Sequence, residues 1–151
     1  MADTKYLSEA RTLLTLKRAA LGSLAERDGT SFPFVSLVLP ALSPEGVPVL
    51  LLSDLSDHAK NLQRDPRASL LMDGTLELKE PLTGPRLTLV GEVGVSPDQQ
   101  GDKARYLAVH PEAELYAGFG DFRFYRFRFF EGLFVAGFGR IFRLKPEELK
   151  G

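Results

Sequence analysis

The chain has 151 residues, a length typical of one domain, and its hydrophobic (44%) and charged (26%) fractions are those of an ordinary globular protein. The formal net charge of -1 excludes a strongly basic platform for nucleic acids. The absence of cysteine excludes disulfides, thiolate nucleophiles and cysteine-ligated zinc or iron–sulfur centres. No apolar run reaches the ~18 residues of a membrane span and no signal-peptide pattern opens the chain, so we expect a single soluble, cytoplasmic domain over residues 1–151.

The first third of the chain predicts one helix followed by strands. Leu7, Ala10 and Leu14 recur at helical spacing, which predicts a helix from about Thr4 to Ala20. A turn signal at Asp28-Gly29 then separates two apolar segments. We expect strands over 20–27 and 32–39 and, after a turn at 43–46, a strand over 47–53 that forms a hairpin with its predecessor.

The rest of the chain continues mostly as short strands. We expect a short helix within 53–66, strands over 67–73 and 86–95, and a helix from 97–98 to about 110. Phenylalanines at 122 and 124, then at 127 and 129, predict a bulge or a change of buried face near Tyr125 and Arg126. A turn at Glu131-Gly132 is expected to lead into a last strand over 133–142. Short connections and hairpin spacing favour a mainly β (α+β) barrel of six or seven strands with peripheral helices.

One segment, 53–71, gathers polar side chains where a strand passes into a helix. The first turns of that helix expose unpaired N–H groups and the positive end of the helix dipole, which favour an anion such as a phosphate. Ser and Asp are also ordinary helix N-caps, so plain capping is the alternative. The candidate anion-binding residues are Ser53, Ser56, His58, Lys60 and Asn61.

No other pattern in the chain assigns chemistry. His110 precedes a proline at a helix end, where a structural role is expected. The alternating phenylalanines and arginines of 122–130 allow base stacking by a single-stranded nucleic acid, but a core strand with solvated arginines is the preferred interpretation. No carboxylate pair, nucleophile elbow or metal-ligand spacing is present, so no catalytic residue and no metal ligand is assigned.

Several motifs resemble the FMN-binding split-barrel superfamily related to pyridoxamine 5'-phosphate oxidase, and within it most resemble the haem-utilisation (HugZ-like) branch. They follow one another in order from about residue 5 to residue 145. The matching pieces are Gly29, Pro33-Phe-Val-Ser-Leu-Val38, Leu51-Leu-Ser-Asp-Leu-Ser-Asp-His-Ala-Lys-Asn-Leu62, Asp65-Pro-Arg-Ala-Ser-Leu-Leu71, Pro85-Arg-Leu-Thr-Leu-Val-Gly91, Asp121-Phe122 and Gly137-Phe-Gly-Arg140.

The resemblance implies a homodimer with cofactor sites in the clefts between subunits. It places the FMN phosphate at the turn that carries the five candidate residues named above, with Arg86 as a second positive charge. The strand that holds Phe34, Val35 and Ser36 would run along the ribityl chain and the isoalloxazine ring. A flavin carries its own redox chemistry, so a flavin-dependent oxidoreductase needs no obligatory acid or base from the chain.

The chain also departs from both branches of the superfamily. It has no tryptophan and lacks the C-terminal signature of a true pyridoxamine phosphate oxidase, which argues against vitamin B6 oxidation. Asp121 and Arg140 match positions near the haem in the haem-utilisation branch, but the C-terminal extension that carries the iron-ligating histidine there is not found. The sequence therefore predicts an FMN-binding oxidoreductase of unknown substrate or electron donor, without nucleic-acid or membrane partners. The alternatives are a haem-binding protein that uses the same cleft and a non-catalytic flavin-binding or sensor module.

Overall fold

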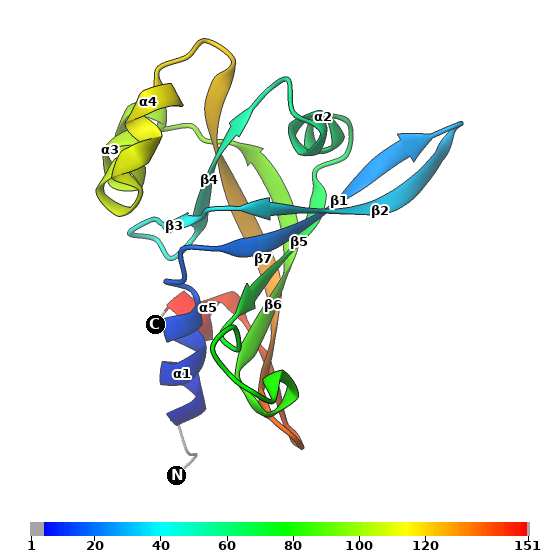
Figure 1. The fold of residues 1–151 in the computed structure, drawn as a ribbon, viewed down its shortest axis with the longest axis vertical. Helices are drawn as coiled ribbons and strands as arrows, with labels where there is room; N and C mark the ends of the chain where they lie inside the picture. The colour runs from blue at the N-terminus through cyan, green and yellow to red at the C-terminus, as the bar shows by residue number, and fades with distance from the viewer. Residues whose placement is uncertain (1–4, 151) are drawn as a thin grey trace.

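A single antiparallel sheet of eight strands organises the computed structural model, which describes residues 5–150 (Figure 1). The strand order is β2-β1-β5-β6-β7-β4-β3, and β8 adds to β7 off this path. The strands are β1 (Ala19–Arg27), β2 (Thr30–Val38), β3 (Ala41–Leu42), β4 (Pro48–Ser53), β5 (Arg67–Asp73), β6 (Arg86–Val95), β7 (Phe122–Gly137) and β8 (Arg140–Leu144).

Short helices occupy the ends and one side of this sheet. In Figure 1, α3 and α4 lie at the upper left, α2 lies at the upper end beside the strands, and α1 and α5 lie together at the lower left. No helix among residues 5–150 is long and apolar enough to span a membrane. The helices are α1 (Lys5–Leu13), α2 (Asp57–Arg64), α3 (Gln99–Val109), α4 (Glu114–Ala117) and α5 (Pro146–Lys150), with 3-10 turns at Pro81–Thr83 and Pro111–Ala113.

The first helix is shorter than the sequence predicted. It ends at Leu13 because the next backbone N–H groups bond three residues back, as in a tight turn, and residues from Ala19 onward already pair in β1. The hydroxyl of Thr15 donates to the carbonyl of Thr12 at 2.6 Å, which further favours a turn over another helical turn. The start of the predicted helix, at Thr4, lies outside the described residues.

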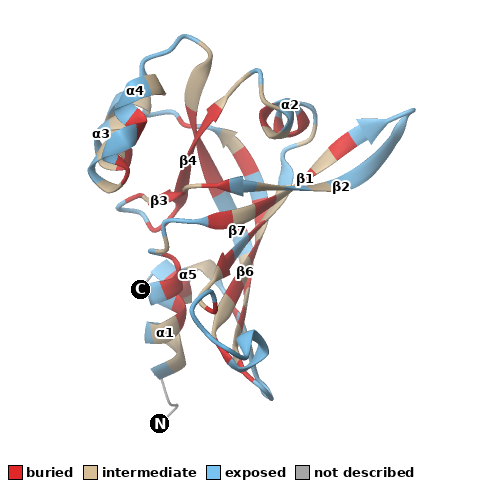
Figure 2. Cartoon of the chain, viewed as in Figure 1, coloured by how far each residue is buried: buried red, intermediate tan, exposed pale blue. Residues whose placement is uncertain are grey.

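The β1–β2 hairpin forms as predicted and projects from the body of the molecule as an arm. Asp28 and Gly29 both have positive φ (53° and 77°), as a two-residue type I′ turn requires. Only Ala20–Gly22 of β1 pair with β5, so the outer part of the hairpin has no neighbouring strand (Figure 1). Figure 2 shows that the tip of this arm is exposed.

The strand over 48–53 does not form the hairpin that the sequence predicted. The segment 30–38 pairs only with β1, and β4 pairs instead with the two-residue β3 and with β7. Pro40, which follows β2, has no N–H for a ladder, and its carbonyl accepts from His110 instead. The chain therefore switches from one edge of the sheet to the other between β2 and β3.

One long strand, β7, replaces the two strands and the Glu131-Gly132 turn expected from the sequence. It pairs with β6 along one edge, and with β4 and then β8 along the other. Gly132 stays in the strand, where an added Cβ would lie 2.7 Å from Leu149. The turn comes after Gly137, where Gly139 provides the positive φ of 73°.

The change in the phenylalanine pattern reflects burial on both faces rather than a bulge at Tyr125–Arg126. Residues 124–127 are all buried, because one face of β7 contacts the main core and the other contacts α3 and α4. Tyr125 and Phe127 belong to the main core, and Phe124 packs with Tyr106 in the smaller cluster. The bulge that does occur lies further on, at Phe130, which has no direct partner opposite Val90–Gly91.

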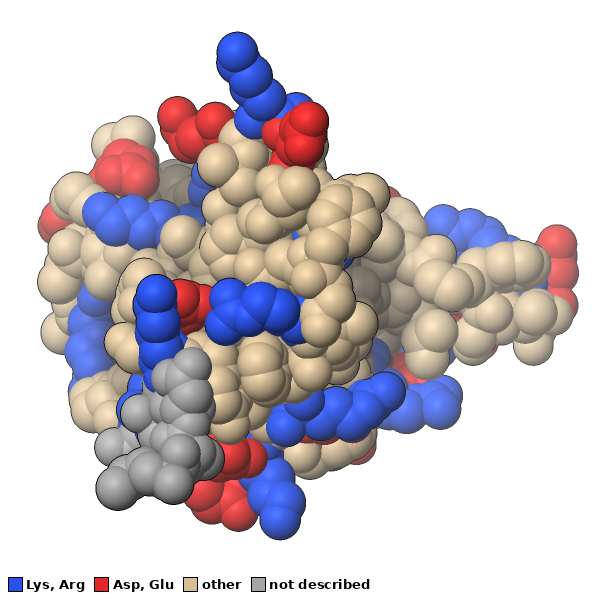
Figure 3. Space-filling model, turned by 90° about the horizontal axis from the view of Figure 1, so that it is seen from below, with Lys and Arg blue, Asp and Glu red and all other residues tan. Residues whose placement is uncertain are grey.

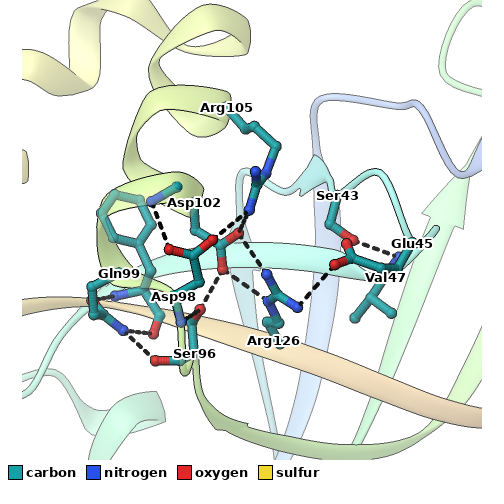
Figure 4. A network of polar contacts seen from close by, with 11 residues as sticks. Ser43, Glu45, Val47, Ser96, Asp98, Gln99, Asp102, Arg105 and Arg126 are labelled. Atoms are coloured by element: carbon teal, nitrogen blue, oxygen red, sulfur yellow. Dashed lines mark hydrogen bonds and ion pairs between the residues drawn. The ribbon is translucent and has the colours of Figure 1, made fainter.

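A buried carboxylate attaches α3 to this doubly covered half of β7 (Figure 4). Asp102 accepts two hydrogen bonds from Arg126, at 2.9 and 3.0 Å, and one from Arg105 at 2.7 Å. The hydroxyl of Ser96 also donates to it. Figure 4 shows that Arg126 lies between Asp102 and Glu45 of the β3–β4 loop, whose carboxylate is 3.7 Å away.

Candidate functional site

The start of α2 is capped by one of the predicted anion-binding serines. Ser56 has extended backbone angles and its side chain accepts from the N–H of Ala59 at 3.3 Å. Its hydroxyl donates to the carbonyl of Ser53 at 2.7 Å. The hydroxyl of Ser56 thus serves the ordinary function of an N-cap, which was the structural alternative for this residue.

Ser53 is also engaged within the protein. Its hydroxyl donates to a carboxylate oxygen of Asp121 at 2.6 Å and accepts from the N–H of Leu55 at 3.2 Å. The backbone N–H of Asp54 bonds the carbonyl of Asp121 at 2.6 Å. Asp54, Asp57 and Asp121 therefore bring three carboxylates to the β4–α2 turn, and their charge opposes a phosphate at Ser53.

A cluster that the sequence analysis missed holds this turn to β7. The hydroxyl of Tyr125 donates to Asp54 at 2.7 Å, and Nε of Arg123 lies 2.9 Å from the other oxygen of that carboxylate. Burial comes first among the causes that raise the pKa of Tyr125, so this phenol stays protonated and remains a donor. The alternation of arginines with aromatic residues in 122–130 was the only signal, and it was assigned to core and solvent.

Two of the predicted residues meet across the gap between β2 and α2. Oγ of Ser36 lies 2.9 Å from Nδ1 of His58. Burial lowers the pKa of His58, and the nearby carboxylate of Asp57 only partly opposes this shift, so the ring is neutral at pH 7. Nε2 of His58 has no hydrogen bond to any residue of 5–150 and is not among their buried unpartnered atoms, so it reaches solvent.

The other two α2 residues differ in their surroundings. The side-chain amide of Asn61 is buried and donates to the hydroxyl of Ser23 at 3.2 Å, which attaches α2 to β1. The side chain of Lys60 is exposed and makes no hydrogen bond or ion pair with a residue of 5–150. Its ammonium group is therefore available for an anion near the start of α2.

The face of β2 that lies toward α2 carries aromatic side chains. Alternation along the strand places Phe32, Phe34 and Ser36 on one face, with Ser36 bonded to α2. Phe34 is half-buried and Phe32 is 52% exposed. These two phenylalanines form an open aromatic strip that ends at His58.

The opposite face of the arm carries Val35 and a separate groove. Val35 shares its face with Gly22 and Ser69 and is 71% exposed. A groove of about 330 Å³ opens where the arm separates from β5. It is lined by Gly22, Ser23, Leu24, Pro33, Phe34, Val35, Arg67, Ala68 and Ser69.

The remaining predicted residues do not lie at this site within one chain. Arg86 starts β6 opposite Val135 and donates to the carbonyls of Leu82 and Gly84, at 3.0 and 3.1 Å. Arg140 is exposed at the start of β8, beyond the far end of β7 from Asp121. The 16 residues of β7 span ~50 Å at ~3.3 Å per residue, so Asp121 and Arg140 of one chain cannot contact the same small ligand.

Comparison with known proteins agrees with this architecture. The chain matches the family model described as CREG, β-barrel, over residues 3–149. It is 34% identical over 122 residues to the protein called non-canonical heme oxygenase HOZ, chloroplastic, of Arabidopsis thaliana. That match covers 80% of this chain but only 37% of the plant protein.

Two solved structures show the same fold. A heme-binding protein from Mycobacterium smegmatis has a TM-score of 0.86 and 28% identity, and the match covers 99% of this chain and 62% of that one. A Clostridium acetobutylicum protein of the pyridoxinephosphate oxidase family has a TM-score of 0.72 and 17% identity, covering 98% and 99% of the two chains. The second likeness concerns the fold alone.

These findings define a split-barrel protein, with eight strands where the sequence predicted six or seven. The chain belongs to the CREG β-barrel family. The predicted relationship to the split-barrel proteins of haem utilisation and to the pyridoxamine phosphate oxidase-like proteins is confirmed.

Proposed function

We propose that this protein binds haem, or a closely similar tetrapyrrole, on the surface formed by β2 and the start of α2. The observation that carries the proposal is the aromatic strip of Phe32 and Phe34 that ends at the neutral imidazole of His58. Relatives named for haem binding and haem oxygenation support the choice of ligand.

The residues present fit the chemistry of a haem. Its macrocycle is flat and apolar, so aromatic side chains that are exposed in the free protein gain from covering it. Its propionates are anionic, and the ammonium group of Lys60 is exposed and unpaired on α2. The iron binds a neutral imidazole nitrogen, which His58 offers.

The proposal includes a homodimer, because the arm that carries the aromatic strip projects from the sheet with an exposed apolar outer face. The arm has no neighbouring strand beyond Gly22, and Val35 and Leu37 on its outer face are 71% and 61% exposed. An isolated two-stranded hairpin is marginally stable in water. A second copy that packs against this outer face would hold the arm in place, and with it the aromatic strip on the opposite face.

FMN is the second candidate ligand, and Lys60 at the start of α2 is the observation that favours it. A phosphate there would be stabilised by the ammonium group and by the helix dipole. The carboxylates of Asp54, Asp57 and Asp121 at the same turn weaken this candidate. If FMN is bound, a flavin-dependent oxidoreductase is the activity expected, and the flavin supplies the electron transfer.

Titration of the purified chain with hemin and, separately, with FMN tests the proposal. We expect hemin to give a Soret band at one equivalent per chain, and the double variant Phe32→Ala/Phe34→Ala to bind roughly tenfold or more weakly, since each phenylalanine contributes ~1.5–3 kcal/mol of burial. Leu115→Ala, an 81% exposed position on α4, is the control. Failure to bind hemin overturns the proposal, and FMN binding in its place supports the second candidate.

Light scattering tests the homodimer. A mass of twice the 16.7 kDa of the chain is expected, and Val35→Asp should lower both the mass and the affinity for hemin. A monomeric wild-type protein that still binds hemin would contradict the dimer and leave the ligand proposal standing.

A further inference from the structure

The chain has only two histidines, and one of them is enclosed by the fold. His110 is 3% exposed, its Nε2 lies 2.9 Å from the carbonyl oxygen of Pro40, and its ring lies 4.8 Å from that of Tyr106. The hydrogen bond occupies Nε2, and the burial of the ring leaves no approach for a flat ligand. His110 is therefore a structural residue, as the sequence predicted.

Several other side chains of the types that bind haem iron are also enclosed or occupied. The chain has no cysteine, and Met72 is fully buried in the main core. The phenol of Tyr106 donates to the carbonyl of Leu39 at 2.7 Å, and that of Tyr125 donates to Asp54. Neither phenol is free to lose its proton to a metal.

His58 differs from all of these in its surroundings. It is half-buried at the start of α2, burial keeps its ring neutral, and its Nε2 reaches solvent at the end of the aromatic strip. Its position in the first turn of a helix, near the positive end of the helix dipole, also disfavours a protonated imidazolium.

The hydroxyl of Ser36 can donate to Nδ1 or accept from Nδ1–H, so a metal at Nε2 would select the tautomer that carries its proton on Nδ1. When Nδ1–H donates to Oγ of Ser36, Nε2 holds a lone pair and can bind a metal. Metal-binding histidines ordinarily donate their second ring N–H in this way, which fixes the tautomer and the orientation of the ring. The hydroxyl of Ser36 has no other hydrogen-bond partner among residues 5–150 that would compete for its oxygen.

We infer that Nε2 of His58 is the protein ligand of the haem iron and that Ser36 is its positioning residue. This inference rests on the proposed haem-binding function. It reassigns His58 from an anion-binding role to a metal-binding role.

Spectroscopy of the hemin complex tests the ligand directly. We expect the wild-type complex to show the electron paramagnetic resonance and resonance Raman signals of histidine-ligated iron, and His58→Gly to lose them. Added imidazole should restore the signals in His58→Gly, because it occupies the space of the missing side chain. Ser36→Ala should weaken hemin binding roughly tenfold and keep the histidine signal, as expected when Nδ1 loses the hydroxyl that orients the ring.

His110→Gln is the matched control for the other histidine and should keep the histidine signal. If this buried variant does not fold, the imidazole rescue of His58→Gly decides the assignment without it. A histidine signal that persists in His58→Gly, or a wild-type complex with no nitrogen ligand, overturns the inference while hemin binding still supports the proposed function. Absence of hemin binding by the wild-type chain overturns both.

Discussion

The guanidinium of Arg126 in β7 binds the fully buried carboxylate of Asp102 in α3 by two hydrogen bonds, at 2.9 and 3.0 Å. The two residues are 24 positions apart in the chain and come from different layers of the fold. Charged side chains without water require a partner of this kind, because removal of one leaves the other unpaired in a medium of low polarity. The pair therefore fixes α3, and the turn and helix that follow it, against β7.

Asp102→Ala should be strongly destabilising. The substitution leaves the buried Arg126 without its main partner. Loss of one member of a buried ion pair typically lowers the free energy of unfolding by about 3–5 kcal/mol. Urea denaturation measures the loss of unfolding free energy. Glu131→Gln, which removes the exposed pair with Arg143, is the control and should cost less than ~1 kcal/mol. A loss for Asp102→Ala as small as that of the control would show that the pair contributes no stability.

Acid should destabilise the fold through the same residue. Burial raises the pKa of Asp102, but the hydrogen bonds from Arg126, Ser96 and Arg105 outweigh it and hold the pKa at about 2, below the ordinary value of 3.8. The folded protein thus binds this proton less readily than the unfolded chain. The stabilisation is complete above pH ~4 and is lost as the pH falls toward 2, by ~2 kcal/mol. Thermal melts from pH 5 to pH 2 should show a smaller pH dependence in Asp102→Asn than in the wild type.

Gly91→Ala should destabilise the barrel at the bulge of β7. An added Cβ would lie 2.5 Å from Cα of Phe129 and in conflict with the carbonyl of Arg128, and both are backbone atoms of the paired strand. Overpacking of this kind costs ~1–3 kcal/mol. Gly94→Ala on the same strand is the matched control, since the nearest atom to its added Cβ would be 3.9 Å away, on the flexible side chain of Arg128. Equal midpoints in urea for the two variants would refute the steric argument.

Lys60→Ala tests whether the phosphate of FMN binds at the start of α2. If FMN binds as the second candidate requires, loss of the ammonium group should weaken FMN by roughly fivefold, the value of an exposed ion pair. Riboflavin lacks the phosphate, so its affinity should be unchanged. Fluorescence titration of both ligands measures the difference, and equal losses would place the phosphate elsewhere.

Hemin binding should depend on pH through His58. Its pKa lies below the ordinary 6.5 because burial disfavours the charged ring, while Asp57 on the same helix partly opposes the shift and Ser36 on β2 is uncharged. Above that pKa Nε2 is available, and below it a proton competes with the iron. Affinity should therefore be constant near pH 7 and fall as the pH drops through the lowered pKa of His58. His58→Gln should remove this dependence, and an unchanged profile in that variant would assign it to another group.

Much of the barrel followed from local pattern. The Asp28-Gly29 turn, the strands over 67–73 and 86–95, and the capping role of Ser56 depend on neighbours within a few residues, and the structure agrees with each. The single strand of 122–137 did not follow, because burial of 124–127 depends on α3 and α4 covering the outer face of β7. A two-residue repeat is visible only where one face of a strand is buried.

The candidate site likewise combines features that the sequence predicts with contacts that only the tertiary structure determines. The sequence by itself placed His58, Lys60 and Asn61 at the start of a helix and predicted the strand that carries Phe34 and Ser36. Tertiary structure decided the rest. It turned the hydroxyl of Ser53 toward Asp121, directed Arg86 to its own loop, and brought Ser36 to Nδ1 of His58 across 22 residues. A short side chain reaches only ~3 Å, so the partner that it finds depends on which elements the sheet order places side by side, and that order is a property of the whole barrel.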